Sequence, residues 1–305
     1  MWARWLPNGW VMTVELATDQ PLDLAASLES GQSHRWERDG DWFSGVVQGA
    51  FIKMRQTGKR IEFRCDSRPQ SSVESLLRSY FRLDDNLPAI YSEIRADPRV
   101  AEMVDRYPGL RLLRIEPWEC LISFICSANS NIPRIHQNME ALAENFGDRV
   151  FINGQSRNGQ SRHAFPTAAQ LGEAGEMELR RLGLGFRAPY VDKTTRMVLD
   201  GRLDLASLVK MPYAEAKSKL MECPGIGPKV ADCIAVFPLD KLEAFPIDVW
   251  IRRALGEWYF PGQKTPTDRV LLEWAQSHFG RYGGYAQQYL FHGMRLREKV
   301  TRGSA

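Results

Sequence analysis

The sequence contains few cysteines and no arrangement of them that is typical of a metal site. Five cysteines occur among its 305 residues. Their number is odd and no Cys-x-x-Cys pair occurs, so neither a disulfide framework nor a structural zinc site is expected. No cysteine cluster lies towards the C-terminus either, which excludes an iron–sulfur centre held by such a cluster.

Long hydrophobic runs and a strong net charge are also missing. No apolar run reaches the roughly 18 residues needed to cross a membrane, and the first residues lack the apolar core and cleavage site of a signal peptide. We therefore expect an intracellular protein with no membrane partner, in the cytoplasm or nucleoid of a bacterium or in the nucleus of a eukaryote. The net charge of +3 permits a nucleic-acid partner without requiring one. Nothing indicates an obligate oligomer, so we expect a monomer.

The first third of the chain has the pattern of a β-sheet. Short runs rich in Val, Ile, Phe, Trp and Thr are separated by glycines, and Asp39-Gly40 between two such runs is a strong hairpin signal. We expect an antiparallel sheet over residues 10–66. Its strands are expected at 11–16, 33–38, 42–47, 51–55 and 61–64.

Helical periodicity replaces this pattern after residue 68. Apolar residues recur with a period of 3.6 over 72–81, and Gly, Pro and Asn breaks separate the later candidate helices. The fold class is therefore α+β, with a sheet domain and a following helix over 1–85 and an all-helical domain over 86–305. An exposed loop is expected over 153–162. The later helices are expected at 88–105, 117–127, 132–146, 176–182, 187–200, 213–222, 229–237, 249–259, 267–280 and 283–296.

The stretch CPGIGPKVADC at 223–233 joins a tight turn to a helix start, within a predicted hairpin of helices over 213–237. Gly225 and Gly227 allow positive φ and a close backbone approach, and Pro228 suits the first helical position. Bare amides at a helix N-terminus can bind phosphate without reading bases. A tight structural corner is the commoner explanation of such a turn, so the turn alone does not decide between the two.

Lys229 lies in the first helical turn, where a positive charge opposes the helix dipole. It is either a solvated surface residue or an amine prepared to attack an electrophilic carbon. Cys233 follows one turn later on the same face. Asp248 precedes a helical run and suits an N-cap. A carboxylate held in that way can also stabilise a developing positive charge or move protons.

Taken together, five segments in the same order resemble the 8-oxoguanine DNA glycosylase family of helix–hairpin–helix base-excision glycosylases. The resemblance covers nearly the whole chain. The segments are GQSHRW at 31–36, FICSANSNIPRI at 124–135, LGLGFRAPY at 182–190, the stretch 224–248, and YAQQYLF at 285–291.

The resemblance implies a bifunctional DNA glycosylase and AP lyase that grips duplex DNA and flips a damaged base into a pocket. Lys229 would attack C1′ of the sugar and expel 8-oxoguanine from opposite cytosine. The resulting imine would undergo β-elimination, which cuts the strand 3′ to the site. Asp248 would stabilise the cationic transition state. This covalent amine chemistry requires no metal or redox cofactor.

The same resemblance assigns the pocket. Gln287 would hydrogen-bond the edge of the flipped base, and Phe291, one helical turn later, would stack on it. Cys233 would cover the opposite face. The backbone carbonyl of Gly31 would accept the N7–H that 8-oxoguanine has and guanine lacks. From the residues alone, Gln287 is more simply a surface glutamine and Phe291 a core residue.

Contacts to DNA and to an ion follow from the resemblance as well. Asn129 and Phe186 would fill the gap left by the flipped base and wedge the stack, and Arg134 and Arg187 would contact the orphaned partner base. The amides at Gly225 and Gly227 would hold the DNA backbone. A structural K⁺, Na⁺ or Ca²⁺ ion would be held by three hairpin carbonyls, those of Met221, Cys223 and Ile226.

The sequence departs from the family at the edge of the pocket. Animal members have a histidine two residues after the aspartate and an acidic partner for it three residues after the pocket phenylalanine. Those positions are Trp250 and Met294 here. A polar pair is thus exchanged for an apolar contact. Phe186 for tyrosine and His34 for phenylalanine are milder changes, and together they suggest a divergent, bacterial-type branch.

Two alternatives remain open. One is a helix–hairpin–helix glycosylase for another damaged purine, such as a formamidopyrimidine. Lys229 argues against the monofunctional alkylation enzymes, and the missing cysteine cluster argues against the iron–sulfur branches. The other alternative is a non-catalytic DNA-binding module that uses the hairpin only for phosphate. The presence of both Lys229 and Asp248 disfavours it.

Overall fold

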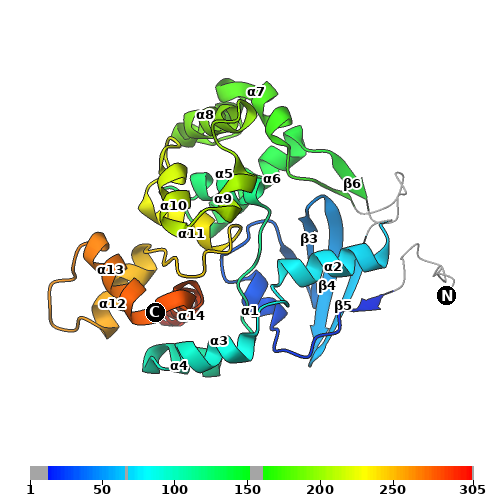
Figure 1. Ribbon diagram of the computed structural model, residues 1–305. Coiled ribbons are helices and arrows are strands. Elements are labelled where there is room, and N and C mark those ends of the chain that lie inside the picture. Colours follow the sequence, from blue (N-terminus) through cyan, green and yellow to red (C-terminus); the bar gives the residue numbers. More distant parts are fainter. Residues whose placement is uncertain (1–12, 66–67, 152–160, 304–305) are drawn as a thin grey trace.

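The computed structural model describes residues 13–65, 68–151 and 161–303, and it has the predicted α+β architecture (Figure 1). The N-terminal part is a five-stranded antiparallel sheet in the order β1-β5-β4-β3-β2. Its strands are β1 (Val14–Glu15), β2 (Glu37–Asp39), β3 (Trp42–Val47), β4 (Ala50–Thr57) and β5 (Arg60–Cys65).

The predicted hairpin at Asp39-Gly40 is confirmed, since Asp39 pairs with Trp42 and Gly40 has φ +58°. Two details of the sheet prediction were wrong. The expected strand 33–38 begins only at Glu37. Residues Leu24–Leu28 form a short helix, α1, because the Asp23 carboxylate caps it by accepting the Ala26 N–H at 2.8 Å.

Helices make up most of the remaining chain. They are α2 (Gln70–Tyr80), α3 (Leu87–Ile94), α4 (Pro98–Arg106), α5 (Pro117–Cys126), α6 (Ile132–Phe146), α7 (Ala168–Arg181), α8 (Ala188–Leu199), α9 (Leu205–Lys210), α10 (Tyr213–Met221), α11 (Pro228–Val236), α12 (Val249–Trp258), α13 (Asp268–Phe279) and α14 (Gly283–Gly303). Short 3₁₀ turns, η2 (Gly185–Arg187) and η3 (Gly280–Tyr282), precede α8 and α14.

The structure corrects three helix predictions. The single helix expected at 88–105 is two, because Asp97 caps a new helix that has Pro98 at its first position. A helical segment from Ala168 was missed; it meets the helix expected from 176 at a kink, where Gly175 has φ +69°. Helix α9 was missed because it is only six residues long.

The expected loop at 153–162 lies mostly outside the described residues. Its flanks pair as a small hairpin of β6 (Arg149–Phe151) and β7 (Ser161–His163). The last two residues assigned to that loop are therefore in a strand. The division of the chain at residue 85 stays a prediction.

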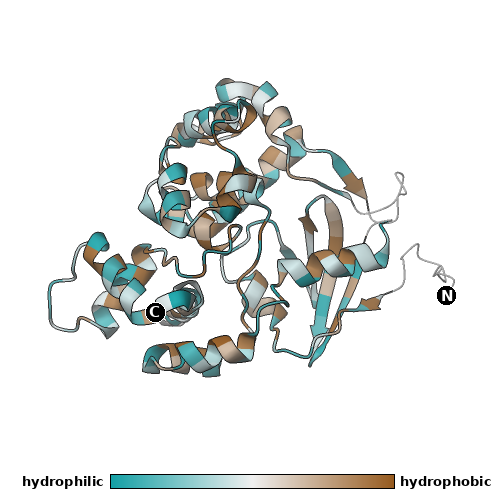
Figure 2. Cartoon of the chain, in the orientation of Figure 1, coloured by the Kyte–Doolittle hydropathy of each residue, from teal (hydrophilic) through white to brown (hydrophobic). Residues whose placement is uncertain are grey.

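The helices form two groups beside the sheet (Figure 1). Helices α5 to α11 form one group, and α4 packs with α12 and α14 in the other. Helix α5 is buried almost all round, whereas α2 and α4 alternate hydrophobic and hydrophilic residues around the helix (Figure 2). No helix among the described residues is long and apolar enough to cross a membrane.

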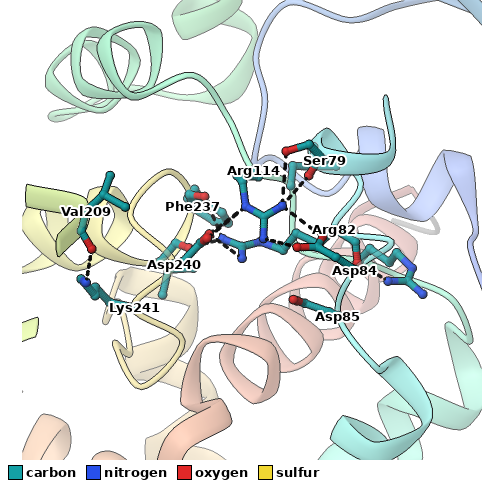
Figure 3. Close-up of polar contacts among 12 residues, drawn as sticks. Ser79, Arg82, Asp84, Asp85, Arg114, Val209, Phe237, Asp240 and Lys241 are labelled. Carbon is teal, nitrogen blue, oxygen red and sulfur yellow. Dashed lines mark hydrogen bonds and ion pairs between the residues drawn. The ribbon is translucent and has the colours of Figure 1, made fainter. Parts of the chain in front are cut away.

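The buried Arg82 and the half-buried Arg114 join the N-terminal part to the end of α11 (Figure 3). The Arg82 guanidinium donates to the backbone carbonyls of Val236 and Phe237, both at 2.9 Å, and pairs with Asp240 at 2.6 Å. Arg114 binds Asp240 and Asp84 at 3.0 and 3.1 Å. These contacts fix the helix that carries Lys229 relative to the sheet.

Candidate active site

A cavity of about 960 Å³ opens where the two helical groups meet the N-terminal part. Six of the predicted site residues line it, and they come from five separate segments of the chain. They are Gly31, Asn129, Lys229, Asp248, Trp250 and Phe291.

Lys229 enters this cavity as the second residue of α11. The cap position is Gly227, which makes no side-chain hydrogen bond, so the helix begins with bare amides, as predicted. The Lys229 Nζ lies 5.3 Å from the ring centroid of Phe124, and Phe124 stacks on Phe237 at 5.6 Å. An aromatic face attracts an ammonium group, so this pair of rings holds the lysine at the cavity wall.

Asp248 is the N-cap of α12, as its position in the sequence predicted. Its Oδ1 accepts the N–H groups of Trp250 and Ile251 at 3.0 and 2.8 Å. Burial raises the pKa of the Asp248 carboxyl, while these backbone hydrogen bonds and the charge of Lys229 act in the opposite direction. The Asp248 side chain is therefore oriented by the first amides of α12, and the charge of Lys229 favours its ionised form.

Cys233 is buried behind Lys229 and does not line the cavity. Burial raises the pKa of its thiol to about 11, and the charge and hydrogen bond of Lys229 only partly offset this. The thiol is therefore neutral at physiological pH and lies next to the amine as a hydrogen-bond partner.

The structure brings His34 into the site, in the place where animal members have a phenylalanine. Its ring meets Phe124 edge-on at 6.1 Å. Burial, the charge of Lys229 and that of His136 lower the pKa of His34 to about 3. The imidazole is therefore neutral, like the aromatic ring it replaces.

Gly31 and Phe291 form the opposite wall. Gly31 has φ +82°, and a Cβ there would lie 2.9 Å from Cδ1 of Ile132 and 3.5 Å from Cε1 of Phe291. A side chain at this position would thus be strained and would fill the cavity. Gln287 and Met294 are buried in α14 and are not among the lining residues. The predicted contact between Trp250 and Met294 stays a prediction.

The residues predicted to touch the DNA gap lie at one edge of the cavity. Asn129 has φ +47°, and its carbonyl accepts from Nη2 of Arg187 at 2.8 Å. The Arg187 guanidinium lies 4.4 Å from the ring centroid of Phe186, which is 48% exposed. Arg134 donates to the carbonyl of Gly183 at 2.8 Å. These bonds tie the 129 loop to the 183–187 turn.

The hairpin itself is tightly packed at one glycine and open at the other. A Cβ on Gly225, which has φ +82°, would lie 2.5 Å from the Tyr190 ring, whereas one on Gly227 would meet open space. The Cys223 carbonyl accepts from the Ile226 N–H at 3.1 Å. Met221 ends α10, where helix carbonyls lack intrahelical donors. The ion at the carbonyls of Met221, Cys223 and Ile226 stays a prediction, and no cluster of metal-binding side chains occurs among the described residues.

Sequence reasoning missed Phe124 and Arg295 as site residues. Phe124 sits in an apolar helix where nothing local marks it as different from its neighbours. Arg295 could have been found, because it lies one helical turn after Phe291 and so shares its face. Both line the cavity.

Comparisons with known proteins agree with this geometry. Residues 15–121 match the model of the 8-oxoguanine DNA glycosylase N-terminal domain. Residues 122–276 match the HhH-GPD superfamily of base excision DNA repair proteins.

Full-length relatives support the same assignment. The chain is 33% identical to N-glycosylase/DNA lyase OGG1 of Arabidopsis thaliana, over 90% of this chain and 78% of that protein. It is 31% identical to N-glycosylase/DNA lyase of Saccharomyces cerevisiae, over 88% and 82%. Its fold matches the Clostridium acetobutylicum 8-oxoguanine glycosylase/lyase bound to dsDNA containing cytosine opposite 8-oxoG. The TM-score is 0.85, with 28% identity over 95% of this chain and 99% of that one. The chain therefore belongs to the 8-oxoguanine DNA glycosylase family, within the HhH-GPD superfamily of base excision DNA repair proteins.

Proposed function

We propose that this protein is a bifunctional DNA glycosylase and AP lyase that removes 8-oxoguanine opposite cytosine from duplex DNA. The observation that carries the proposal is that Lys229 and Asp248, from two different helices, line one cavity. The cavity volume falls in the range typical of small-molecule sites, which is ample for a flipped purine. A purely phosphate-binding hairpin would need neither side chain there.

The reaction follows from these two groups. A base in the stack is out of reach, so the nucleotide is flipped into the cavity. Once it has given up a proton to water, the Lys229 Nζ forms a bond to C1′ while the C1′–N9 bond breaks, and the electron pair of that bond leaves with the base. Asp248 stabilises the positive charge that builds up on the sugar. After the amine loses a proton, its nitrogen lone pair forms the C1′=N imine while the C1′–O4′ bond breaks and O4′ takes up a proton. The protonated imine makes a C2′ proton acidic, and β-elimination then breaks the C3′–O bond.

Residues of the cavity wall and buried residues of α11 and α14 outside the lining recognise the base in this proposal. Phe291 stacks on it and Gln287 hydrogen-bonds its Watson–Crick edge from the preceding turn of α14. The carbonyl of Gly31 accepts N7–H, and the neutral thiol of Cys233 lies behind the amine. Trp250 and Met294 contribute an apolar boundary in place of the polar pair.

The DNA is held by positions outside the cavity. Asn129 and Phe186 take the place of the flipped nucleotide, Arg134 and Arg187 meet the opposite base, and the amides after Gly225 hold a phosphate. A structural K⁺, Na⁺ or Ca²⁺ ion at the hairpin carbonyls would support that phosphate contact, and the chemistry itself uses no cofactor. We further propose that the protein acts as a monomer inside the cell, where its substrate is.

Borohydride trapping tests the proposal. Wild-type protein incubated with a duplex containing 8-oxoguanine opposite cytosine should form a covalent adduct, because borohydride reduces the imine. Lys229→Gln should trap less than about a hundredth as much, since the nucleophile is lost. Lys193→Gln, which changes an exposed lysine on α8, should trap like wild type.

A panel of lesions identifies the substrate. Duplexes containing 8-oxoguanine, a formamidopyrimidine, an alkylated purine or an undamaged guanine should be excised fastest at 8-oxoguanine. Preference for the formamidopyrimidine would support the alternative lesion. Trapping of the Lys229→Gln variant at the wild-type level would contradict the assigned nucleophile. Binding of the duplexes without excision of any base would support the non-catalytic DNA-binding module.

A further inference from the structure

Arg295 is a cavity residue that none of the roles above uses. It lies on α14 one turn after Phe291, is only 9% exposed, and still lines the cavity. Its guanidinium carbon lies 5.8 Å from the Phe291 ring centroid. Its Nη1 lies 3.6 Å from the place that a Cβ on Gly31 would take. The guanidinium is therefore next to Gly31 and Phe291, which form one wall of the cavity in which the base is proposed to lie.

The polar atoms of Arg295 are only partly satisfied. Nη2 donates to the backbone carbonyl of Glu29. The buried Nε has no hydrogen-bond partner, and among the residues that the structure describes Nη1 has none either. The charge of the Glu29 carboxylate favours the charged form of Arg295, but no carboxylate in the described ranges forms an ion pair with it. A buried donor without an acceptor is costly, so the Nε of Arg295 can gain from an acceptor that enters the cavity.

The order of side chains along α14 indicates which acceptor. Gln287, Phe291 and Arg295 follow one another at intervals of one turn, about 6 Å apart along the helix. If Gln287 is at the Watson–Crick edge and Phe291 under the rings, Arg295 is at the opposite, five-membered-ring edge. That edge carries the oxygen on C8.

We propose that Arg295 is a specificity and catalytic residue that donates a charged hydrogen bond to the C8 oxygen of the flipped 8-oxoguanine. This inference rests on the proposed function. When the C1′–N9 bond breaks, the electron pair left on N9 is conjugated with the C8 carbonyl. Part of the negative charge of the departing base therefore appears on that oxygen, until the base takes up a proton. A fixed guanidinium stabilises this charge most strongly in the transition state.

A simpler role is also conceivable for Arg295. Together with Gln288, whose Nε2 donates to the carbonyl of Ser30 at 3.3 Å, it ties the loop at 29–31 to α14. An experiment therefore has to separate contact with the C8 substituent from support of the loop that carries Gly31.

The test compares two substrates that differ only at C8. In 8-thioguanine the oxygen is replaced by sulfur, a weak acceptor, and N7–H is kept. Single-turnover excision opposite cytosine is measured with wild type, Arg295→Met and Arg295→Lys. Arg297→Met is the matched control, since Arg297 is on the same helix, is exposed and pairs with Glu257 at 2.7 Å. Cleavage of a preformed abasic duplex and the unfolding temperature are measured in parallel.

We expect Arg295→Met to slow 8-oxoguanine excision about 10- to 100-fold, the effect of losing one charge-assisted hydrogen bond. Excision of 8-thioguanine should change much less. The ratio of the 8-oxoguanine rate to the 8-thioguanine rate should therefore be lower for Arg295→Met than for wild type. Abasic cleavage should stay within about twofold, because no base occupies the cavity. Arg295→Lys should recover part of the rate, and Arg297→Met should match wild type.

An unchanged ratio of 8-oxoguanine to 8-thioguanine excision would overturn the inference and leave Arg295 as a support for the loop. Parallel loss of excision, abasic cleavage and duplex affinity would overturn it in favour of a phosphate contact. A wild-type protein that excises neither base would instead contradict the proposed function, and that result is visible before any variant is compared.

Discussion

Replacing Asp248 by Asn or by Ala separates its structural task from its chemical one. The Oδ1 atom accepts two N–H groups at the start of α12, at 3.0 and 2.8 Å. Asn keeps an acceptor in the same place and Ala removes it. We therefore expect Asp248→Ala to lower the free energy of unfolding by about 1 kcal/mol, and the unfolding temperature by about 2–4 °C. Asp248→Asn should change the free energy by no more than about 0.5 kcal/mol.

The charge of Asp248 adds a pH dependence with a defined sign. Burial raises the pKa of this carboxyl above its ordinary value. Between the ordinary and the raised pKa, the folded protein binds more protons than the unfolded chain. The stability contributed by this group therefore falls as the pH rises through that window. Above that window the ionised carboxylate lowers the stability of the fold and Asn does not, so Asp248→Asn should there unfold at the wild-type temperature or above it.

Activity should fall in both variants, although only Asp248→Ala should lose stability. Both variants lose the negative charge that faces the sugar, so single-turnover excision of 8-oxoguanine should fall about 10²- to 10³-fold, or 2.7–4 kcal/mol, comparable to losing one preorganised electrostatic group. Excision and thermal unfolding are measured on the same preparations. An Asn variant that excises at the wild-type rate would refute the catalytic role. An Asn variant less stable than the Ala variant would refute the capping argument.

Two further substitutions test the frame around the site. Gly225→Ala should destabilise the protein by more than about 2 kcal/mol in a denaturant titration, because it combines a positive φ with a Cβ 2.5 Å from Tyr190. The matched variant Gly227→Ala should lose no more than about 1 kcal/mol of unfolding free energy. Equal losses in the two variants would contradict the packing argument. Arg82→Met should cost about 2–4 kcal/mol, since it leaves two buried backbone carbonyls without their donor and leaves Asp240 with Arg114 as its remaining partner. A change below 1 kcal/mol at Arg82 would show that this junction does not hold α11 in place.

Local sequence signals predicted the elements that depend on local physics. Asp39-Gly40 marked a hairpin because few residues adopt positive φ without strain, and Asp248 marked a helix start because its side chain reaches the first amides. Periodicity failed where a break fell inside a continuous apolar pattern. Pro98 divides the expected helix 88–105 in this way, and Gly175 interrupts α7.

The sequence by itself determined the chemical groups of the site, which are a lysine at an uncapped helix N-terminus and an aspartate at the next helix start. Only the tertiary structure decided what surrounds them. Gly31, Phe124 and Arg295 come from distant parts of the chain, and the fold places all three on the wall of the cavity that Lys229 enters. The low pKa of His34 and the high pKa of Cys233 also arise there, since burial causes both; the lysine charge lowers the pKa of His34 further and offsets only part of the rise at Cys233. Burial and long-range contact depend on how elements pack, and no local pattern encodes them.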